Sequence, residues 1–250
     1  MTTKKWVLLI VSGMAGCAVL VAIGLFAWFF GLGSAGVDGW MPVYKTEQTA
    51  STHPGFLHTT VTSGTSVYVS DYEEYALEVE NKEPKNAIGR QPVGGASVYA
   101  IDGQKATDYI AVDEGSEMPA YGVYRNSQLP PFDWQHAKFQ LMILSGSISP
   151  RVGQRVTDPA LIDDVVTALR DGTPVPSPTL AAGNAKNIHA LSLCTDQLPG
   201  IVYSPKVYVD PAGPVYLASS VAMVSPNSNQ WKEARWVPAG PLFTKWVRMP

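Results

Sequence analysis

An uncharged apolar run near the N-terminus, Trp6–Phe30, constrains this chain more than any other feature. At ~1.5 Å rise per residue, a helix over this run exceeds the ~30 Å hydrocarbon core of a bilayer and can span a membrane. Lys4 and Lys5 precede the run, and the next basic residue is Lys45. Because basic residues stay on the cytoplasmic side, the sequence predicts a cytoplasmic tail at 1–5 and an extracytoplasmic chain after the run. We therefore expect a single-pass protein of the cell membrane.

Two other fates of the apolar run stay open. Cleavage after the small residues at 33–35 would make the run a secretory signal, although it is far longer than the ~7–15 apolar residues of such a signal. Met14–Cys17 resembles the lipobox of bacterial lipoproteins, with Cys17 as the acylated residue. The segment after Cys17 is still apolar, whereas lipoproteins usually continue with polar residues. An uncleaved anchor therefore fits the sequence best, with a secreted protein or a lipoprotein as alternatives.

Small side chains recur at four-residue spacing within the run, at Ser12, Gly13, Gly16 and Cys17. This spacing lets two helix backbones approach closely and is typical of dimerising membrane helices. Small residues are also common in membrane helices for other reasons. The small residues therefore either form a homodimer contact through Ser12, Gly13 and Gly16 or only reflect the usual composition of a membrane helix.

The composition limits the kinds of protein to which the predicted extracytoplasmic part can belong. Without Lys4 and Lys5, the chain has 16 basic and 21 acidic residues, a net charge of −5, so we expect no nucleic-acid partner. The two cysteines, Cys17 and Cys194, lie on different sides of the predicted membrane boundary, so no disulfide is expected outside. No Asn-x-Ser/Thr glycosylation site is present. These absences favour a bacterial cell-envelope protein. We interpret Cys194 as a buried strand cysteine rather than a reactive one.

Residues 31–54 are rich in glycine and then polar, which predicts a juxtamembrane linker before a domain at 55–250. From residue 55 the apolar pattern alternates with period two, as in half-buried strands. The strands that this pattern predicts are 56–61, 65–69, 75–79, 96–101, 109–112, 121–124, 138–144, 188–193, 206–209 and 215–218. Asp102-Gly103 predicts a hairpin turn, and the charged segment 81–95 predicts a loop.

One helix is well signalled at about 158–171. Asp158 is a suitable N-cap, Pro159 fits the first helical position and Gly172 is placed to end the helix. Residues at helical spacing are expected to face the sheet, namely Leu161, Ile162, Val165, Val166 and Leu169, with Asp163, Asp164, Thr167 and Arg170 toward solvent. The fold class predicted is α+β, a mainly antiparallel sheet with at least one packed helix. Segment 81–95 or 145–154 is the expected boundary if the domain has two subdomains.

The sequence names no catalytic set. No two of the four histidines have metal-ligand spacing, and no nucleophile motif or phosphate-binding loop occurs, so no metal or cofactor is predicted. Acidic runs at 71–80 and 113–117 are explained most simply as solvated surface, although paired carboxylates also serve glycoside hydrolysis.

The C-terminal part is rich in aromatic residues with basic residues between them. This composition resembles a glycan- or peptide-binding surface, and the candidate binding residues are Trp231, Arg235, Trp236 and Trp246. The simpler explanation is that these tryptophans close the core of the sheet. The function predicted is a membrane-anchored module that binds an envelope protein or glycan. The alternative is a membrane-anchored hydrolase of envelope polymers.

Overall fold

The computed structural model describes residues 41–50, 57–70, 77–80, 84–92, 97–113, 121–145, 153–178, 187–211, 213–218 and 234–249. The contacts divide the chain into residues 1–42 and residues 43–250, and every element named below belongs to the second unit. The predicted anchor Trp6–Phe30, with Ser12, Gly13, Gly16 and Cys17, lies outside the described residues. Within the described ranges, no helix has the length and apolar character needed to cross a membrane.

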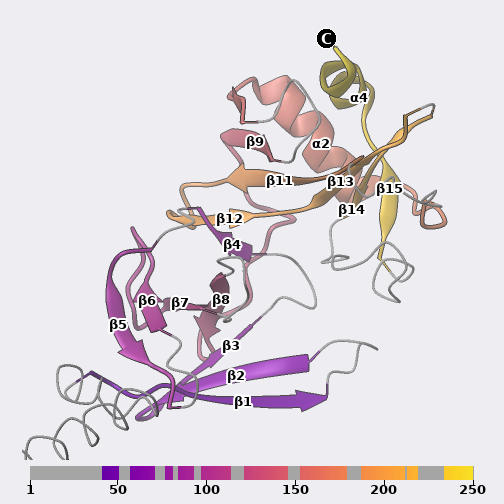
Figure 1. The fold of residues 1–250 in the computed structure, drawn as a ribbon. Coiled ribbons are helices and arrows are strands. Elements are labelled where there is room, and N and C mark those ends of the chain that lie inside the picture. Colours follow the sequence, from indigo (N-terminus) through magenta and orange to yellow (C-terminus); the bar gives the residue numbers. More distant parts are fainter. Residues whose placement is uncertain are drawn as a thin grey trace, which may run out of the picture. The chain divides into compact units, whose positions relative to one another are not determined.

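Within the described residues, fifteen strands form one sheet in which the strand pairs are antiparallel (Figure 1). The main path runs β1-β2-β3-β8-β4-β12-β11-β13-β14-β15, with β5, β6 and β7 joined at β8 and with β9 and β10 joined at β11. The strands are β1 (Lys45–Ala50), β2 (Leu57–Ser63), β3 (Ser66–Val69), β4 (Leu77–Val79), β5 (Ala87–Arg90), β6 (Ser97–Ala100), β7 (Tyr109–Asp113), β8 (Tyr121–Asn126), β9 (Leu141–Ser145), β10 (Arg155–Val156), β11 (Ile188–Cys194), β12 (Ile201–Tyr203), β13 (Lys206–Val209), β14 (Val215–Ala218) and β15 (Trp236–Pro238). The predicted antiparallel sheet is therefore confirmed.

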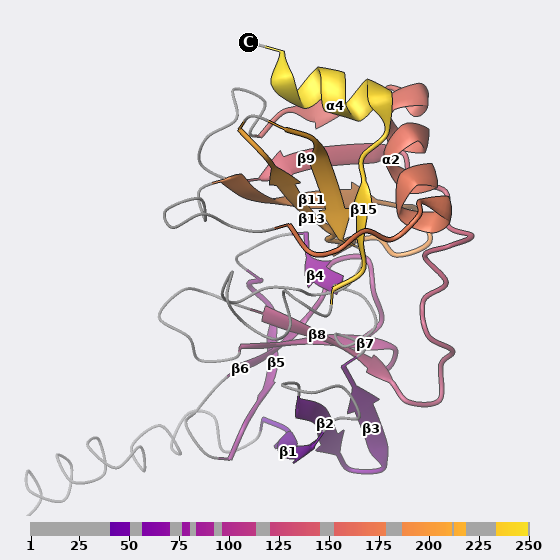
Figure 2. The ribbon, with the colours of Figure 1, turned by 90° about the vertical axis from the view of Figure 1, so that its right-hand side faces the viewer.

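Two helices complete the described fold, α2 (Pro159–Asp171) and α4 (Pro241–Arg248). Helix α2 contacts α4, β14 and β15, and Figure 2 shows the two helices next to each other. Burial alternates along β11, so Leu191 and Leu193 join the helices in the largest core cluster. On the opposite side of the neighbouring strands, Tyr208 and Trp236 belong to a separate cluster, so both faces are covered here. A third cluster, built around Val61 and Ile110, fills the space among β2, β3 and β6–β8.

The helix predicted at 158–171 is confirmed. The Asp158 side chain accepts a hydrogen bond from the Ala160 N–H, Pro159 begins the helix, and the Gly172 N–H donates to the Ala168 carbonyl at its end. The five residues expected to face the sheet are all buried, and they are Leu161, Ile162, Val165, Val166 and Leu169. Helical periodicity therefore identified the packed face correctly.

The expectation that the other face is entirely solvent-exposed is wrong at two positions. Arg170 donates to the Trp134 and Ala137 carbonyls, the latter at 2.9 Å. Asp164 accepts a hydrogen bond from the Phe243 N–H at 2.9 Å. Gly240 is the N-cap residue of α4, and it has no side chain that could accept a capping hydrogen bond. Asp164 on α2 therefore supplies the cap that α4 lacks, in the position where an anion also favours the helix dipole.

Replacing Asp164 with Ala should therefore destabilise the protein, against the sequence-based expectation of an exposed and neutral site. We expect a loss of about 1–2 kcal/mol in the free energy of unfolding, as for removal of a helix N-cap. Asp164→Asn keeps an acceptor oxygen and should cost less. Thermal or denaturant melts measure both. Asp163→Ala is the control because Asp163 is exposed on the same helix. Equal, negligible effects at Asp164 and Asp163 would contradict the proposed cap.

The predicted linker at 31–54 is wrong for its described part. Lys45–Ala50 form β1, which pairs with β2 along its whole length. Tyr44 is buried, and its N–H donates to the Arg90 carbonyl. The folded unit therefore begins before residue 55. In its first strand, Lys45, Glu47, Gln48 and Thr49 are polar and exposed, so the pairing partner rather than an apolar pattern makes it a strand.

The predicted loop at 81–95 contains β5, which pairs with β6 through a register shift between Ala87 and Gly89. The bulge interrupts the period-two pattern, so sequence alternation does not show this strand. The predicted hairpin of β6 and β7 is confirmed, but its connection is longer than a tight turn. It has two successive turns, with hydrogen bonds from Gln104 N–H to the Ile101 carbonyl and from Asp108 N–H to the Lys105 carbonyl.

Candidate functional site

A pocket lies where the end of β4, the turn after β6 and the turn before β12 meet. Its volume is about 250 Å³. The residues that line it are Val79, Glu80, Pro84, Ala100, Ile101, Asp102 and Gly200. The lining thus combines apolar side chains with two carboxylates from segments far apart in the sequence.

Two glycines hold the walls of this pocket together. Gly200 has a φ of +76°, and a Cβ added to it would lie 2.0 Å from the Asp102 carbonyl oxygen. Gly103 has a φ of +81°, and its Cβ would lie 2.8 Å from the Pro199 Cβ. The two turns therefore touch through the backbones of Gly200 and Asp102 and through Gly103 against the Pro199 ring, and a side chain at either glycine would separate them. Further bonds join the walls: Gln104 Nε2 donates to the Pro199 carbonyl, and the Glu80 N–H donates to the Gly200 carbonyl.

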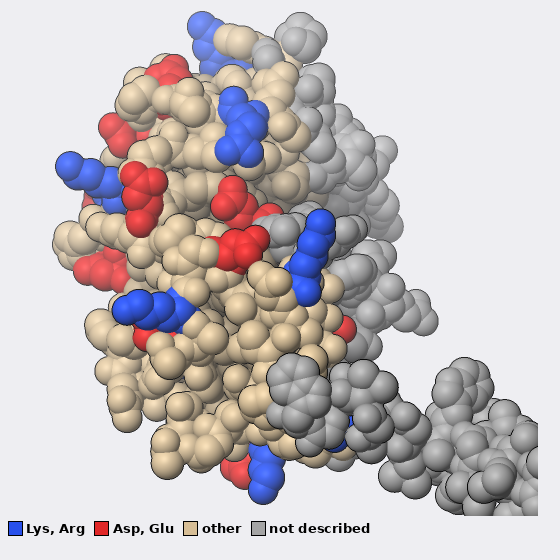
Figure 3. Space-filling view, turned by 90° about the vertical axis from the view of Figure 1, so that its left-hand side faces the viewer, with Lys and Arg blue, Asp and Glu red and all other residues tan. Residues whose placement is uncertain are grey.

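The two pocket carboxylates lack an ion pair with a described residue, whereas the nearby carboxylate of Glu78 has one. Glu78 on β4 forms an ion pair with Lys206, with Oε1 and Nζ 3.2 Å apart. Glu80 and Asp102 are exposed, and neither side chain forms a hydrogen bond or ion pair with a described residue. Charges of both signs are interspersed on the face drawn in Figure 3. The pocket carboxylates thus provide a local negative charge that no described cation offsets.

The negative charge of Glu80 acts on the Cys194 thiol. The prediction of a buried strand cysteine is confirmed for the strand, β11, whereas the thiol is only half-buried. Burial, with a smaller contribution from the negative charge of Glu80, raises the pKa of Cys194 to about 11, against an opposing effect of Arg155. The thiol is therefore protonated at neutral pH and is a poor nucleophile.

The predicted binding residues that the structure describes pack against other parts of the fold. Trp231 lies outside the described residues. Trp236 is fully buried in the cluster with Tyr208. Trp246 on α4 packs against Phe243, with ring centroids 5.6 Å apart. The described members therefore do not form one exposed aromatic surface, and the role of this set in binding stays a prediction.

Arg235, the basic member of that set, contacts the end of α2. Its guanidinium donates to the carbonyls of Leu169 at 2.6 Å and of Gly172 at 2.8 Å, with a longer contact to Arg170. The last carbonyls of a helix lack intrahelical partners, and a cation there also suits the helix dipole. Arg235 thus joins α2 to β15, and this contact occupies the donors that a ligand would need.

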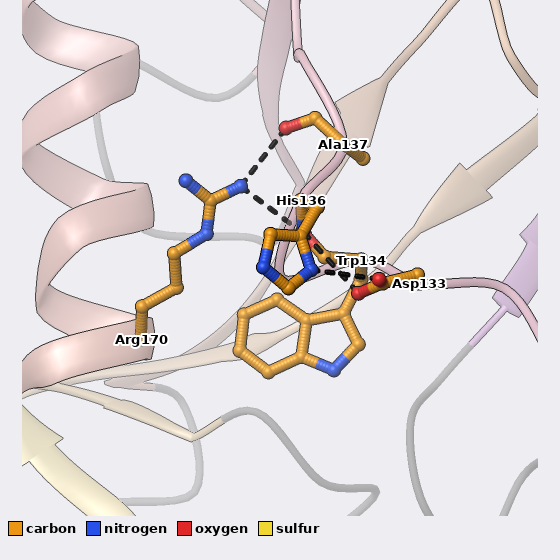
Figure 4. Close-up of polar contacts among 5 residues, drawn as sticks. All are labelled: Asp133, Trp134, His136, Ala137 and Arg170. Atoms are coloured by element: carbon orange, nitrogen blue, oxygen red, sulfur yellow. Dashed lines mark hydrogen bonds and ion pairs between the residues drawn. The ribbon is translucent and has the colours of Figure 1, made fainter.

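No histidine is among the described residues that line the pocket. His136 and Asp133 form a pair with Nδ1 and Oδ2 2.7 Å apart, but their side chains are 83% and 63% exposed (Figure 4). The hydrogen bond from His136 lowers the pKa of Asp133. His189 is buried, burial lowers its pKa, and its Nδ1 has no partner among the described residues. His53 lies outside the described residues, and no group of three metal-ligating side chains occurs within them.

The loop that carries His136 has a packing role. Figure 4 shows Arg170 reaching from α2 to the backbone of this loop. Trp134 in the same loop stacks on Tyr203, with centroids 5.0 Å apart, and Phe139 also packs against Tyr203. The loop is therefore fastened to the sheet on its inner side, and the Asp133–His136 pair lies on its outer side.

The pocket is not apparent from the sequence. Glu80 belongs to an acidic run that was interpreted as solvated surface, and Asp102 was interpreted only as a turn residue. The glycine-bearing turns at 102–103 and 199–200 were visible signals, but nothing in the sequence shows that they touch. Comparisons with family models, with curated proteins and with solved structures found no significant match for this chain.

Proposed function

We propose that this chain is a membrane-anchored module that works outside the cytoplasm and binds an envelope protein or glycan. The apolar run Trp6–Phe30 and the basic residues before it support the anchor and its orientation. The observation that carries the binding role is the pocket between the two glycine turns. It is concave, it has both apolar and charged walls, and its rim is held by backbone contacts. Such preformed sites are typical of ligand recognition.

A hydrolase of envelope polymers is the second candidate, because two carboxylates line one pocket and glycosidases use such pairs. Two features favour binding over hydrolysis. Glu80 and Asp102 are both exposed, whereas the general acid of a glycosidase is held in an apolar environment that keeps it protonated. The half-buried thiol near Glu80 is protonated, so it does not supply a nucleophile.

The binding role predicts a partner that contacts the pocket in living cells. The test is a full-length chain that carries a photo-crosslinking amino acid at Pro84, which lines the pocket, or at Asp163, which is exposed on α2. A C-terminal reporter that is active only outside the cytoplasm checks the topology in the same cells. We expect an active reporter and a discrete crosslinked adduct from position 84 that position 163 does not give.

Either part of this result can contradict the proposal. An inactive reporter would place the folded unit in the cytoplasm. The absence of an adduct at position 84, or the same adducts at both positions, would show that the pocket is not a binding site. Loss of the adduct after protease digestion identifies a protein partner, and loss after glycan digestion identifies a glycan. Degradation of purified envelope polymer that Glu80→Gln abolishes would instead support the hydrolase.

A further inference from the structure

We propose that the pocket binds a basic side chain, a lysine or an arginine, of a partner protein, with its cationic head between Glu80 and Asp102. This inference rests on the proposed function, because it names the group that the pocket would hold. It commits to a protein ligand, since a long basic side chain matches both the charge and the apolar walls of the site.

The charge of the pocket calls for a cation. Glu80 follows β4 and Asp102 lies in the turn after β6, and neither forms an ion pair with a described side chain. The protein satisfies the neighbouring carboxylate differently, because Lys206 reaches Glu78 with its ammonium group. The side chain of Lys206 is only 9% exposed, so its stem is packed while its head meets the carboxylate. Strand β4 thus already holds one lysine in the manner proposed for the pocket.

The walls of the pocket suit a long aliphatic stem. Val79 and Ile101 line it from the main core cluster and are 8% and 2% exposed, while Ala100 and Pro84 are half-buried. Lysine and arginine side chains bury their methylene stems along apolar surface and keep the charged head near water or an acid. A small cation such as a metal ion would use the two carboxylates but leave the apolar walls uncovered. The combination therefore favours an amphipathic basic side chain.

Rigidity lets the two carboxylates act together. The Asp102 wall and the Glu80 wall are joined through Gly200, whose carbonyl accepts from the Glu80 N–H at 2.9 Å and whose Cα faces the Asp102 carbonyl. This contact limits the movement of the two main chains relative to each other, although the exposed side chains of Glu80 and Asp102 still lose rotamer freedom when they bind a cation. A cation held by both carboxylates should therefore bind better than one held by either alone.

The test uses the full chain in detergent micelles and a small basic probe, N-acetyl-lysine amide, followed by NMR at the backbone amides of Glu80 and Gly200. N-acetyl-norleucine amide, which lacks the charge, is the matched neutral probe. We expect the lysine probe to bind and the norleucine probe to bind more weakly. Glu80→Gln or Asp102→Asn should each weaken lysine binding about two- to fivefold, the range of one exposed ion pair. The double variant should bind both probes equally.

Asp163→Asn is the control, because it removes one exposed carboxylate outside the pocket and makes the same change in net charge. It should leave lysine binding unchanged. Equal binding of the two probes by the unmodified chain would overturn the inference, and so would a loss in Asp163→Asn as large as that in Glu80→Gln. Binding of a neutral N-acetylglucosamine oligomer that shifts the same amides and resists both pocket variants would point to a glycan ligand instead.

The cellular crosslink separates this inference from the proposed function. An adduct at position 84 that persists in the Glu80→Gln, Asp102→Asn double variant would keep the binding role and overturn the basic side chain. Binding of the lysine probe without any adduct in cells would support the chemistry of the pocket and overturn the proposed function. An adduct that the double variant abolishes, mapped beside a lysine or arginine of the partner, supports both.

Discussion

Replacing Val165 with Asp should lower the free energy of unfolding by about 3–5 kcal/mol, because the new carboxylate would be buried without a partner. Val165 is 0% exposed and lies in the core cluster between α2 and the sheet. A loss of this size is a large part of the ~5–15 kcal/mol that usually stabilises a domain. Circular dichroism during thermal or urea denaturation measures it. We expect a variant that is mostly unfolded or that melts far below the unmodified protein.

Thr167→Asp is the matched control. It introduces the same charge two residues later on the exposed side of α2. We expect it to cost less than about 1 kcal/mol, with the repulsion from Asp163 one turn earlier as the main contribution. If Thr167→Asp were as damaging as Val165→Asp, the loss would come from helix propensity or net charge, and the packing of α2 given by the structure would be contradicted.

Replacing Gly200 with Ala is the second change with a large expected effect. The added Cβ would lie 2.0 Å from the Asp102 carbonyl oxygen, and the φ of +76° is itself unfavourable for alanine. The backbone conformation alone costs about 1–2 kcal/mol, and separating the two turns adds to it. We expect a total loss of at least about 2 kcal/mol together with a pocket that no longer binds the lysine probe. Denaturant melts and the NMR titration measure the two effects.

Gly64→Ala separates the clash from the backbone conformation. Gly64 also has a positive φ, +58°, but a Cβ there would meet nothing within 4 Å. It lies in the hairpin between β2 and β3, so its substitution should cost about 1–2 kcal/mol and leave the pocket unchanged. Equal losses from Gly64→Ala and Gly200→Ala, with probe binding intact in both, would show that the turn contact does not hold the pocket.

Local patterns predicted the elements whose burial is one-sided. Helix α2 was predicted with its cap, its end and its packed face, because an apolar stripe at helical spacing has one structural meaning. The alternating strand β11 was predicted for the corresponding reason. In both cases the side chains of a single segment carry the whole signal.

Elements that depend on a partner were missed. Strand β12 is buried on both faces and is only three residues long, so it shows no alternation. Strands β1 and β15 were absent from the prediction, and each is held by pairing with one neighbouring strand. Asp164 was assigned to solvent because helical spacing says nothing of a second helix whose N-terminus ends beside it. A backbone pairing or a cap between segments leaves little trace in either segment alone.

The amino-acid sequence by itself determined the apolar N-terminal run, the mainly antiparallel α+β character and the inner face of α2, because each depends on the periodicity or composition of one continuous segment. Only the tertiary structure decided where the pocket lies. Glu80, Asp102 and Gly200 are brought together by the pairing of β4 with β12 and by two glycine turns that touch through their backbones. That contact depends on the absence of two side chains at positions far apart in the chain, and no pattern of neighbouring residues can express it.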